Sequence, residues 1–221
     1  MESTIDTLEI VDIYHKNADP EYAARMSTYM KNNFSFLGIP KPKRAELGKK
    51  FLKLKTKTKK LDWAFVFYLF ELPEREFQYL ALDYLRKLQN HLVKKDIKNL
   101  ERLILAKSWW DSVDTIAPLI GVLCQKYPEL KEEKLKSWMM DSNIWLKRVS
   151  IIFQLKYKDQ VDTEFLKKTI FCNHLTNEFF VNKAIGWALR QYSKFNPDWV
   201  RNFISRNPLS PLSVREGSKY L

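Results

Sequence analysis

The chain has 221 residues, of which 45% are hydrophobic and 29% are charged, so it is long and apolar enough to bury a core of its own. Lysine and arginine number 38 against 26 aspartate and glutamate, a formal net charge of +12 that favours polyanions and makes nucleic acid the first partner to consider. The composition excludes a disulfide-rich scaffold, since there are only two cysteines, and no apolar run reaches the roughly 18 residues of a membrane span.

The N-terminal residues carry early acids and no long apolar run, which argues against a signal peptide and favours a cytoplasmic protein that does not bind membranes. Cys124 and Cys172 lie far apart in apolar surroundings and form no C-x-x-C motif. We therefore expect both to be free thiols buried in the core of a protein from a reducing compartment.

Prolines stand where helices are expected to begin, after Asp19, Leu72, Asn196 and Ser210, and three of these four preceding residues are typical N-caps. Apolar residues recur at spacings of three and four, without the two-residue alternation of strands, so the chain is predicted to be all-α. In chain order the predicted helices span residues 4–15, 20–36, 42–54, 61–71, 73–89, 94–107, 109–126, 129–140, 143–157, 162–172, 177–194, 197–206 and 211–220.

Charge is concentrated in residues 41–60, which hold ten basic residues and a single acid, Glu46. A helix here turns Leu47, Phe51 and Leu54 inward and its lysines outward. Such a pattern is more often a solvated face than a binding face, and we expect non-specific attraction to DNA as a side effect.

An aromatic residue opens four of the predicted helices, and these openers, Phe77, Trp110, Trp145 and Phe180, are spaced by 33, 35 and 35 residues. A period in the thirties indicates stacked helical hairpins. The sequence therefore predicts a single HEAT-like α-solenoid domain over residues 1–221, with one helix of each pair lining a concave side.

That concave side is expected to be basic. Arg148 and Lys183 stand three residues after Trp145 and Phe180, and Arg215 follows Lys183 by 32 residues. Such a row would follow a phosphate backbone through counterion release. In a basic protein, chance alignment is the alternative.

The segment KSWWDSVDTI, residues 107–116, raises a chemical question. Its two indoles point about 100° apart on a helix, so Trp109 and Trp110 cannot both face the core. Trp110 shares a helix face with Asp114, four residues later. Ser108 and Asp111 resemble a capping box, which explains Asp111 but leaves Asp114, beyond the first turn, without a structural reason.

Several kinds of catalytic site are missing from the sequence. His15, His91 and His174 are scattered, no cysteine pair has zinc spacing, and there is no glycine-rich phosphate loop or serine-nucleophile motif. We expect neither a metal nor a nucleotide cofactor. An enzyme whose active site contains only carboxylates, aromatic side chains and basic residues requires a substrate that is itself reactive.

Cleavage of an N-glycosidic bond fits these groups, because it builds positive charge on the sugar that a carboxylate such as Asp114 stabilises. An indole face adds roughly 0.5–2 kcal/mol towards a nearby cation. Trp187 is the best candidate for a second indole beside the carboxylate, because it shares a helix face with Lys183 and Arg190. Gly186 next to it would permit close approach of a ligand. A base alkylated on a ring nitrogen is already cationic, so its departure needs no general acid. The alternative for each tryptophan is a core position.

Several motifs in order resemble one family, the AlkD-like DNA glycosylases, which are HEAT-like repeat proteins of the DNA alkylation repair group. They are YMKN at 29–32, FLGI at 36–39, LPEREF at 72–77, KSWWDSVD at 107–114, NIWL at 143–146 followed by Arg148, and KAIGW at 183–187 followed by Leu189 and Arg190. The similarity covers nearly the whole chain.

This resemblance implies a monomeric glycosylase that excises N3- and N7-alkylated purines from duplex DNA without a metal or cofactor. Carried over by position, Asp114 is the catalytic carboxylate, Trp110 and Trp187 are the walls against the sugar, Arg148 and Arg190 are phosphate contacts, and Tyr29 lies near the DNA. Two alternatives stay open. One is a non-catalytic scaffold for distorted or branched DNA or an acidic protein, and the other, less favoured, is a hydrolase of free nucleosides.

Overall fold

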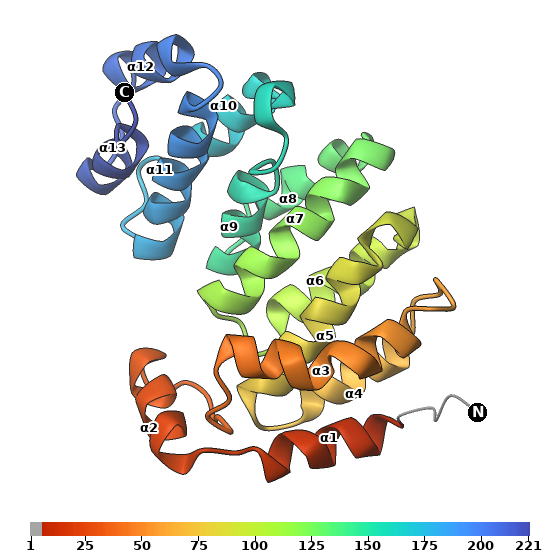
Figure 1. Ribbon diagram of the computed structural model, residues 1–221. Helices are drawn as coiled ribbons and strands as arrows, with labels where there is room; N and C mark the ends of the chain where they lie inside the picture. The colour runs from red at the N-terminus through yellow and green to blue at the C-terminus, as the bar shows by residue number, and fades with distance from the viewer. Residues whose placement is uncertain (1–5) are drawn as a thin grey trace. The chain divides into compact units, whose positions relative to one another are not determined.

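Figure 1 shows the computed structural model, in which residues 6–221 are described. This part of the chain forms thirteen α-helices and no strand apart from an isolated bridge between Ser35 and Glu74, so the all-α prediction is confirmed. Contacts divide the chain into two compact units, Met1–Leu92 and Val93–Leu221, while the single domain over 1–221 stays a prediction. Within residues 6–221 no helix is long and apolar enough to cross a bilayer.

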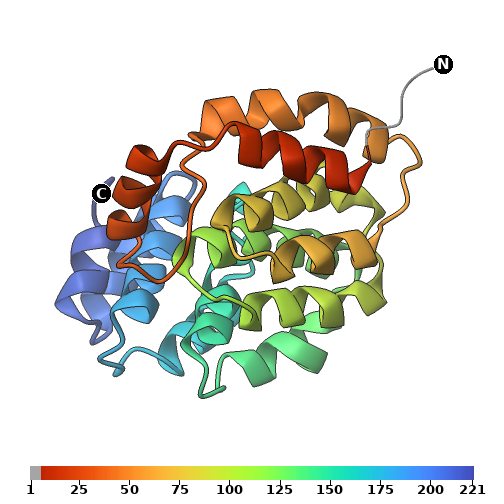
Figure 2. The same ribbon diagram turned by 90° about the horizontal axis from the view of Figure 1, so that it is seen from below.

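The first unit is built around α5, whose side chains Phe77, Leu80, Ala81 and Leu85 are buried. Helix α5 packs on α3 and α4, and α1 packs on α3, as the view in Figure 2 also shows. Tyr14 of α1 stacks on Phe77 with ring centroids 5.7 Å apart. The helices are α1 (Thr7–Lys16), α2 (Pro20–Tyr29), α3 (Lys41–Lys55), α4 (Trp63–Glu71) and α5 (Arg75–Lys87), followed by the 3-10 turn Gln89–His91. Residues 4 and 5 of the predicted helix 4–15 lie outside the described part of the chain.

The predicted helix 20–36 is wrong at its C-terminal end, because α2 stops at Tyr29. The chain then turns into an extended loop whose backbone is held by the buried Glu76 of α5. Its carboxylate accepts hydrogen bonds from the N–H groups of residues 37–39 at 2.9–3.1 Å. Gly38 has φ +83, and a Cβ there would collide with the backbone carbonyl of Asp19, so this turn requires glycine. A hydrogen-bond acceptor 38 residues away in the sequence thus replaces the backbone hydrogen bonds of a helix.

The second unit is a succession of packed helices in which α7 packs on α9, α9 on α11, and α11 on α13 (Figure 1). Its α-helices are α6 (Ile97–Leu105), α7 (Trp110–Lys126), α8 (Lys136–Trp138), α9 (Ile144–Ile152), α10 (Thr163–Phe171), α11 (Phe179–Ser193), α12 (Pro197–Arg206) and α13 (Pro211–Gly217). Two 3-10 turns, Lys94–Asp96 and Lys158–Gln160, and the π-helical turn Lys131–Leu135 complete it. The predicted helix 129–140 is therefore a π turn with a short α-helix, and the predicted helix 143–157 ends at Ile152.

Capping side chains explain most of the helix starts. Asp19, Asn196 and Ser210 accept hydrogen bonds from the backbone two or three residues into α2, α12 and α13, with proline at the first helical position. The start expected at Leu72-Pro73 is wrong, since α5 begins at Arg75. Leucine offers no side-chain acceptor, so the sequence signal there was the proline alone.

The aromatic repeat is confirmed as a repeat of helices. Phe77, Trp110, Trp145 and Phe180 lie in the first turns of α5, α7, α9 and α11. In the second unit, Trp145 and Phe180 lie 5.0 Å apart between ring centroids, and both contact Trp109 at 5.7 and 5.1 Å. Among the openers, aromatic packing between helix starts is therefore seen for α9 and α11, with Trp109 as the third ring.

Both cysteines are free thiols, as expected, but only Cys124 lies in the core. Burial raises the pKa of its thiol to about 12. Cys172 is exposed at the C-terminal end of α10, so the expectation of a second core cysteine is wrong.

Candidate functional site

Asp114 of α7 is held by Arg148 of α9 in a two-point ion pair. Arg148 donates from Nε to Oδ1 at 2.7 Å and from Nη2 to Oδ2 at 2.8 Å, while its Nη1 donates to the Phe180 carbonyl of α11 at 2.6 Å. The Arg148 side chain is 4% exposed and that of Asp114 is 16% exposed. One arginine thus joins three successive helices and fixes both carboxylate oxygens.

Two opposing effects act on the Asp114 carboxyl. Burial raises its pKa above the ordinary value, and the hydrogen bonds and charge of Arg148 act in the lowering direction. Arg148 is consequently the group that favours the anionic form in a site with little access to water. A shielded carboxylate of fixed orientation is well suited to stabilise positive charge on a substrate.

Arg148, the first member of the expected basic row, has a side chain that is only 4% exposed. Its position on α9 turns the side chain between α7 and α11, where Asp114 and the Phe180 carbonyl engage all three of its nitrogens. Arg148 thus fixes the carboxylate, and its role as a phosphate contact stays a prediction. Arg215, the last member of the row, is exposed on α13, and Lys183 is partly exposed on α11.

The two indoles predicted as walls are both half-buried. Trp187 of α11 lies beside the ion pair, with the Arg148 Cζ 5.9 Å from the centre of its ring. Trp110 opens α7, one turn before Asp114. The structure therefore brings Asp114, Arg148 and Trp187 together, and Trp110 adjoins them along the helix.

Trp109, the neighbouring indole, is also half-buried, and it packs against other aromatic rings. It closes the aromatic cluster with Trp145 and Phe180, and its Nε1 is buried without a hydrogen-bond partner among the described residues. The expected capping box is wrong, because the Ser108 hydroxyl donates to the carbonyl of Ile104 at 2.6 Å instead. Helix α7 starts from Trp109 without a side-chain cap.

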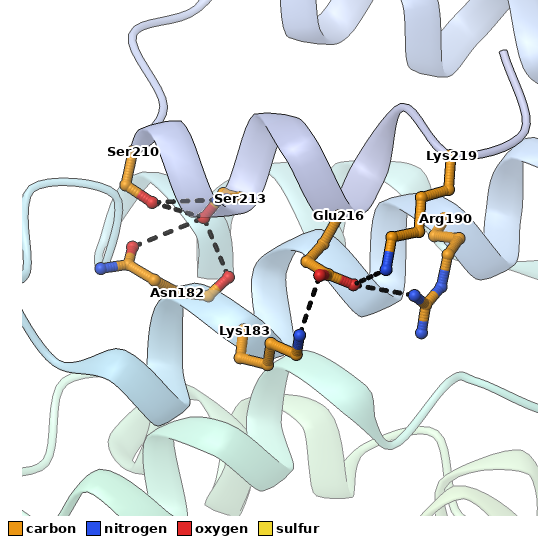
Figure 3. Close-up of polar contacts among 7 residues, drawn as sticks. All are labelled: Asn182, Lys183, Arg190, Ser210, Ser213, Glu216 and Lys219. Atoms are coloured by element: carbon orange, nitrogen blue, oxygen red, sulfur yellow. Dashed lines mark hydrogen bonds and ion pairs between the residues drawn. The ribbon is translucent and has the colours of Figure 1, made fainter.

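A second charged group, absent from our sequence predictions, surrounds Glu216 of α13 (Figure 3). Its carboxylate accepts hydrogen bonds from Lys183 and Arg190 of α11 and from Lys219, each at 2.8 Å. The Glu216 side chain is only 4% exposed. One buried acid therefore fixes three cations, which leaves excess positive charge and unused N–H donors at this edge of the site.

Two of these cations lie on either side of Trp187, because Lys183, Trp187 and Arg190 follow one another on a single face of α11. Gly186 is needed for a different reason than expected. A Cβ there would lie 2.5 Å from the Glu216 Cβ and 3.0 Å from the Ser213 carbonyl oxygen, so the glycine allows α13, rather than a ligand, to approach α11.

Tyr29 belongs to the other unit, at the end of α2, where its side chain is 71% exposed. Its place near DNA stays a prediction. No group of three or more histidine, cysteine, aspartate or glutamate side chains suited to a metal occurs within residues 6–221.

The family model described as "DNA alkylation repair enzyme" matches residues 12–221. The chain belongs to this DNA alkylation repair family. A solved structure, "Predicted DNA alkylation repair enzyme from Enterococcus faecalis", is 37% identical over 92% of this chain and 96% of that one, with a TM-score of 0.85. No protein with a curated description matches the chain.

Membership of the DNA alkylation repair family confirms the resemblance found in the sequence and gives the site its context, the repair of alkylated DNA. The basic groups beside Trp187 suit a polyanionic substrate.

The Glu216 cluster leads to a prediction about stability. Hydrogen bonds from Lys183 and Lys219 lower the pKa of Glu216 to about 2, against 4.5 in an unfolded chain. The stabilisation is therefore fully present above pH 4.5 and is lost as the pH falls towards 2. We expect Glu216→Gln to lower the free energy of unfolding by about 1–3 kcal/mol at neutral pH.

Urea unfolding between pH 7 and pH 3 tests this, and the difference between wild type and variant should shrink below about pH 4.5. Glu164→Gln is the control, because Glu164 pairs with Lys167 at 2.8 Å but is 72% exposed, and its loss should have little effect. A wild-type advantage that stays constant down to pH 3 would contradict the role of the Glu216 charge.

Proposed function

We propose that the protein is an alkylpurine DNA glycosylase that hydrolyses the N-glycosidic bond of N3- and N7-alkylated purines, such as 3-methyladenine and 7-methylguanine, in duplex DNA. The observation that carries the proposal is the buried Asp114–Arg148 pair beside Trp187 in a member of the DNA alkylation repair family. It would act as a monomer, without a metal or nucleotide cofactor.

The proposed reaction needs little more than this group. The bond between the sugar C1′ and the purine nitrogen breaks with both electrons passing to the base, which leaves neutral because it was cationic. Positive charge develops on the sugar, where the Asp114 carboxylate stabilises it and orients the attacking water. Water adds to C1′, its proton passes to Asp114 or to solvent, and the products are the free base and an abasic site.

The remaining residues hold the damaged strand in this proposal. Trp110 and Trp187 present indole faces to a substrate that carries positive charge before and during the reaction. Lys183 and Arg190, anchored on Glu216, keep N–H groups for phosphates on either side of the nucleotide. Arg215 and Tyr29 would be further DNA contacts.

The direct test is release of 7-methylguanine and 3-methyladenine from methylated duplex DNA, measured by chromatography of the freed bases under single-turnover conditions. Release by the wild type supports the proposal. Binding that depends on salt without any released base would instead indicate a scaffold for distorted or branched DNA. Release from free alkylated nucleosides at the same rate would indicate a nucleoside hydrolase.

A further inference from the structure

The charge of this protein is distributed very unevenly. Residues 41–60 contain ten basic residues and one acid, so this short segment carries +9 of the net charge of +12. It forms α3 and the loop that follows it in the first unit. The largest concentration of positive charge in the sequence therefore belongs to the first unit, whereas the residues of the candidate site, except Tyr29, belong to the second.

Helix α3 has two faces of opposite character. Its inner face is buried through Arg44, Gly48, Phe51 and Leu52, and the Arg44 guanidinium lies 4.4 Å from the centre of the Tyr79 ring. The outer face of α3 and the loop after it hold the exposed lysines Lys41, Lys43, Lys49, Lys50, Lys53, Lys57, Lys59 and Lys60. Folding of the helix uses the inner face, and nothing in the packing requires lysine on the outer one.

Few acids neutralise these lysines. Lys43 is 3.5 Å from Glu46, with both side chains well exposed. Among the described residues, Lys49, Lys50, Lys53 and Lys60 have no acidic group within ion-pair distance. Three of them stand at i, i+3 and i, i+4 spacings on α3, where like charges repel and destabilise the helix. A face whose like charges repel and which serves no packing contact fits a role outside folding, and its charge suits a polyanion.

We propose that the outer face of α3 and its following loop form a second DNA-binding surface, which holds duplex DNA through its phosphates. Lysine is a flexible point charge suited to sequence-independent contact with a phosphate backbone. A membrane is the less suitable partner, because no large hydrophobic residue is exposed on α3 to enter a lipid interface. The surface shares duplex DNA with the proposed function but does not depend on base excision.

The test compares two variants of equal charge. In one, Lys49, Lys50, Lys53 and Lys60 are changed to glutamine. In the other, four exposed lysines of the second unit without ion-pair partners among the described residues are changed in the same way, namely Lys95, Lys98, Lys156 and Lys168. Binding to an unmodified 30-base-pair duplex is measured by fluorescence anisotropy over a range of salt concentrations.

The α3 variant should lose about 10- to 100-fold in affinity, and its plot of log affinity against log salt should flatten by roughly 0.9 for each phosphate that the variant no longer neutralises. The control variant should lose less than about 3-fold, the effect of net charge alone. Thermal unfolding should show the α3 variant at least as stable as the wild type, because a repulsion has been removed.

Equal losses in the two variants would overturn the proposal, since net charge would then explain both. Unchanged duplex binding together with lost binding to anionic lipid vesicles would overturn it in favour of a membrane. The result is separate from the proposed function, because unmodified DNA offers no base to excise. If the wild type releases no alkylated base but the α3 variant still loses duplex binding, the surface stands and the glycosylase does not.

Discussion

Asp114→Asn is expected to reduce the single-turnover release of 7-methylguanine from methylated duplex DNA by about 100- to 1000-fold or more. Asparagine keeps the shape of the side chain and one oxygen that accepts from Arg148, but it removes the negative charge. The transition state places positive charge on the sugar, whereas the cationic base carries its charge before the reaction. Removing the carboxylate should therefore destabilise the transition state much more than it affects the binding of the substrate.

Binding and release are expected to respond in opposite directions. Loss of a negative charge from a DNA-binding surface removes a repulsion, so affinity for the duplex at fixed salt should be unchanged or slightly higher. The release rate at saturating protein, together with the dissociation constant for the same duplex, separates the two effects. Parallel loss of both, with a changed circular dichroism spectrum, would indicate misfolding instead.

Asp111→Asn is the matched control, because Asp111 is a second carboxylate on the same helix, one turn closer to its start. We expect it to release the base at close to the wild-type rate. An Asp114→Asn protein that is folded, binds DNA and still releases the base at the wild-type rate would remove Asp114 from the mechanism. Equal damage in the two variants would point to the charge of the helix rather than to one carboxylate.

The parts of the fold that follow from neighbouring residues were predictable from the sequence. Asp19, Asn196 and Ser210 act within their own first turns, and the aromatic openers mark the starts of their own helices. The end of α2 was not predictable in this way. It depends on the carboxylate of Glu76 bonding to residues 37–39, and local periodicity carries no information about such a contact.

The same difference between local and long-range contacts applies to the candidate site. The Trp110–Asp114 spacing is a property of one helix and was read from the sequence, but the burial of Arg148 depends on its neighbours α7 and α11. A usable signal was nevertheless present. Asp114 and Arg148 are 34 residues apart, and Lys183 and Glu216 are 33 apart, close to the repeat period. Opposite charges separated by one repeat are candidates for ion pairs between neighbouring helix pairs, and Glu216 is one of these candidates.

The largest loss of stability is expected from Arg148→Met, which should lower the free energy of unfolding by about 3–5 kcal/mol. Methionine fills much of the same space, so the loss comes mainly from leaving the Asp114 carboxylate buried without its partner and the Phe180 carbonyl without a donor. Chemical denaturation at pH 7 measures the change. Arg201→Met is the control, since Arg201 pairs with Asp198 at 2.6 Å but both are well exposed, and it should cost less than about 1 kcal/mol.

The pH dependence of the stability of Arg148→Met shows why the variant is destabilised. Without the guanidinium, the pKa of Asp114 should rise further above its value in the unfolded chain, because burial already raises it. A carboxyl whose folded pKa is raised destabilises the protein at high pH and recovers as it becomes protonated, so the deficit should be smaller at pH 4 than at pH 7. A deficit independent of pH would mean that lost packing, rather than an unpaired charge, is responsible.

The double variant Asp114→Asn/Arg148→Met completes the argument, because it removes both charges from the buried site. We expect it to recover much of the stability lost in Arg148→Met, with a coupling free energy of about 1–3 kcal/mol between the two positions. Base release should not recover with it, since the carboxylate is still absent. If stability returns but activity does not, the contribution of the pair to folding is distinct from its contribution to catalysis. The reaction then requires the carboxylate of Asp114 itself.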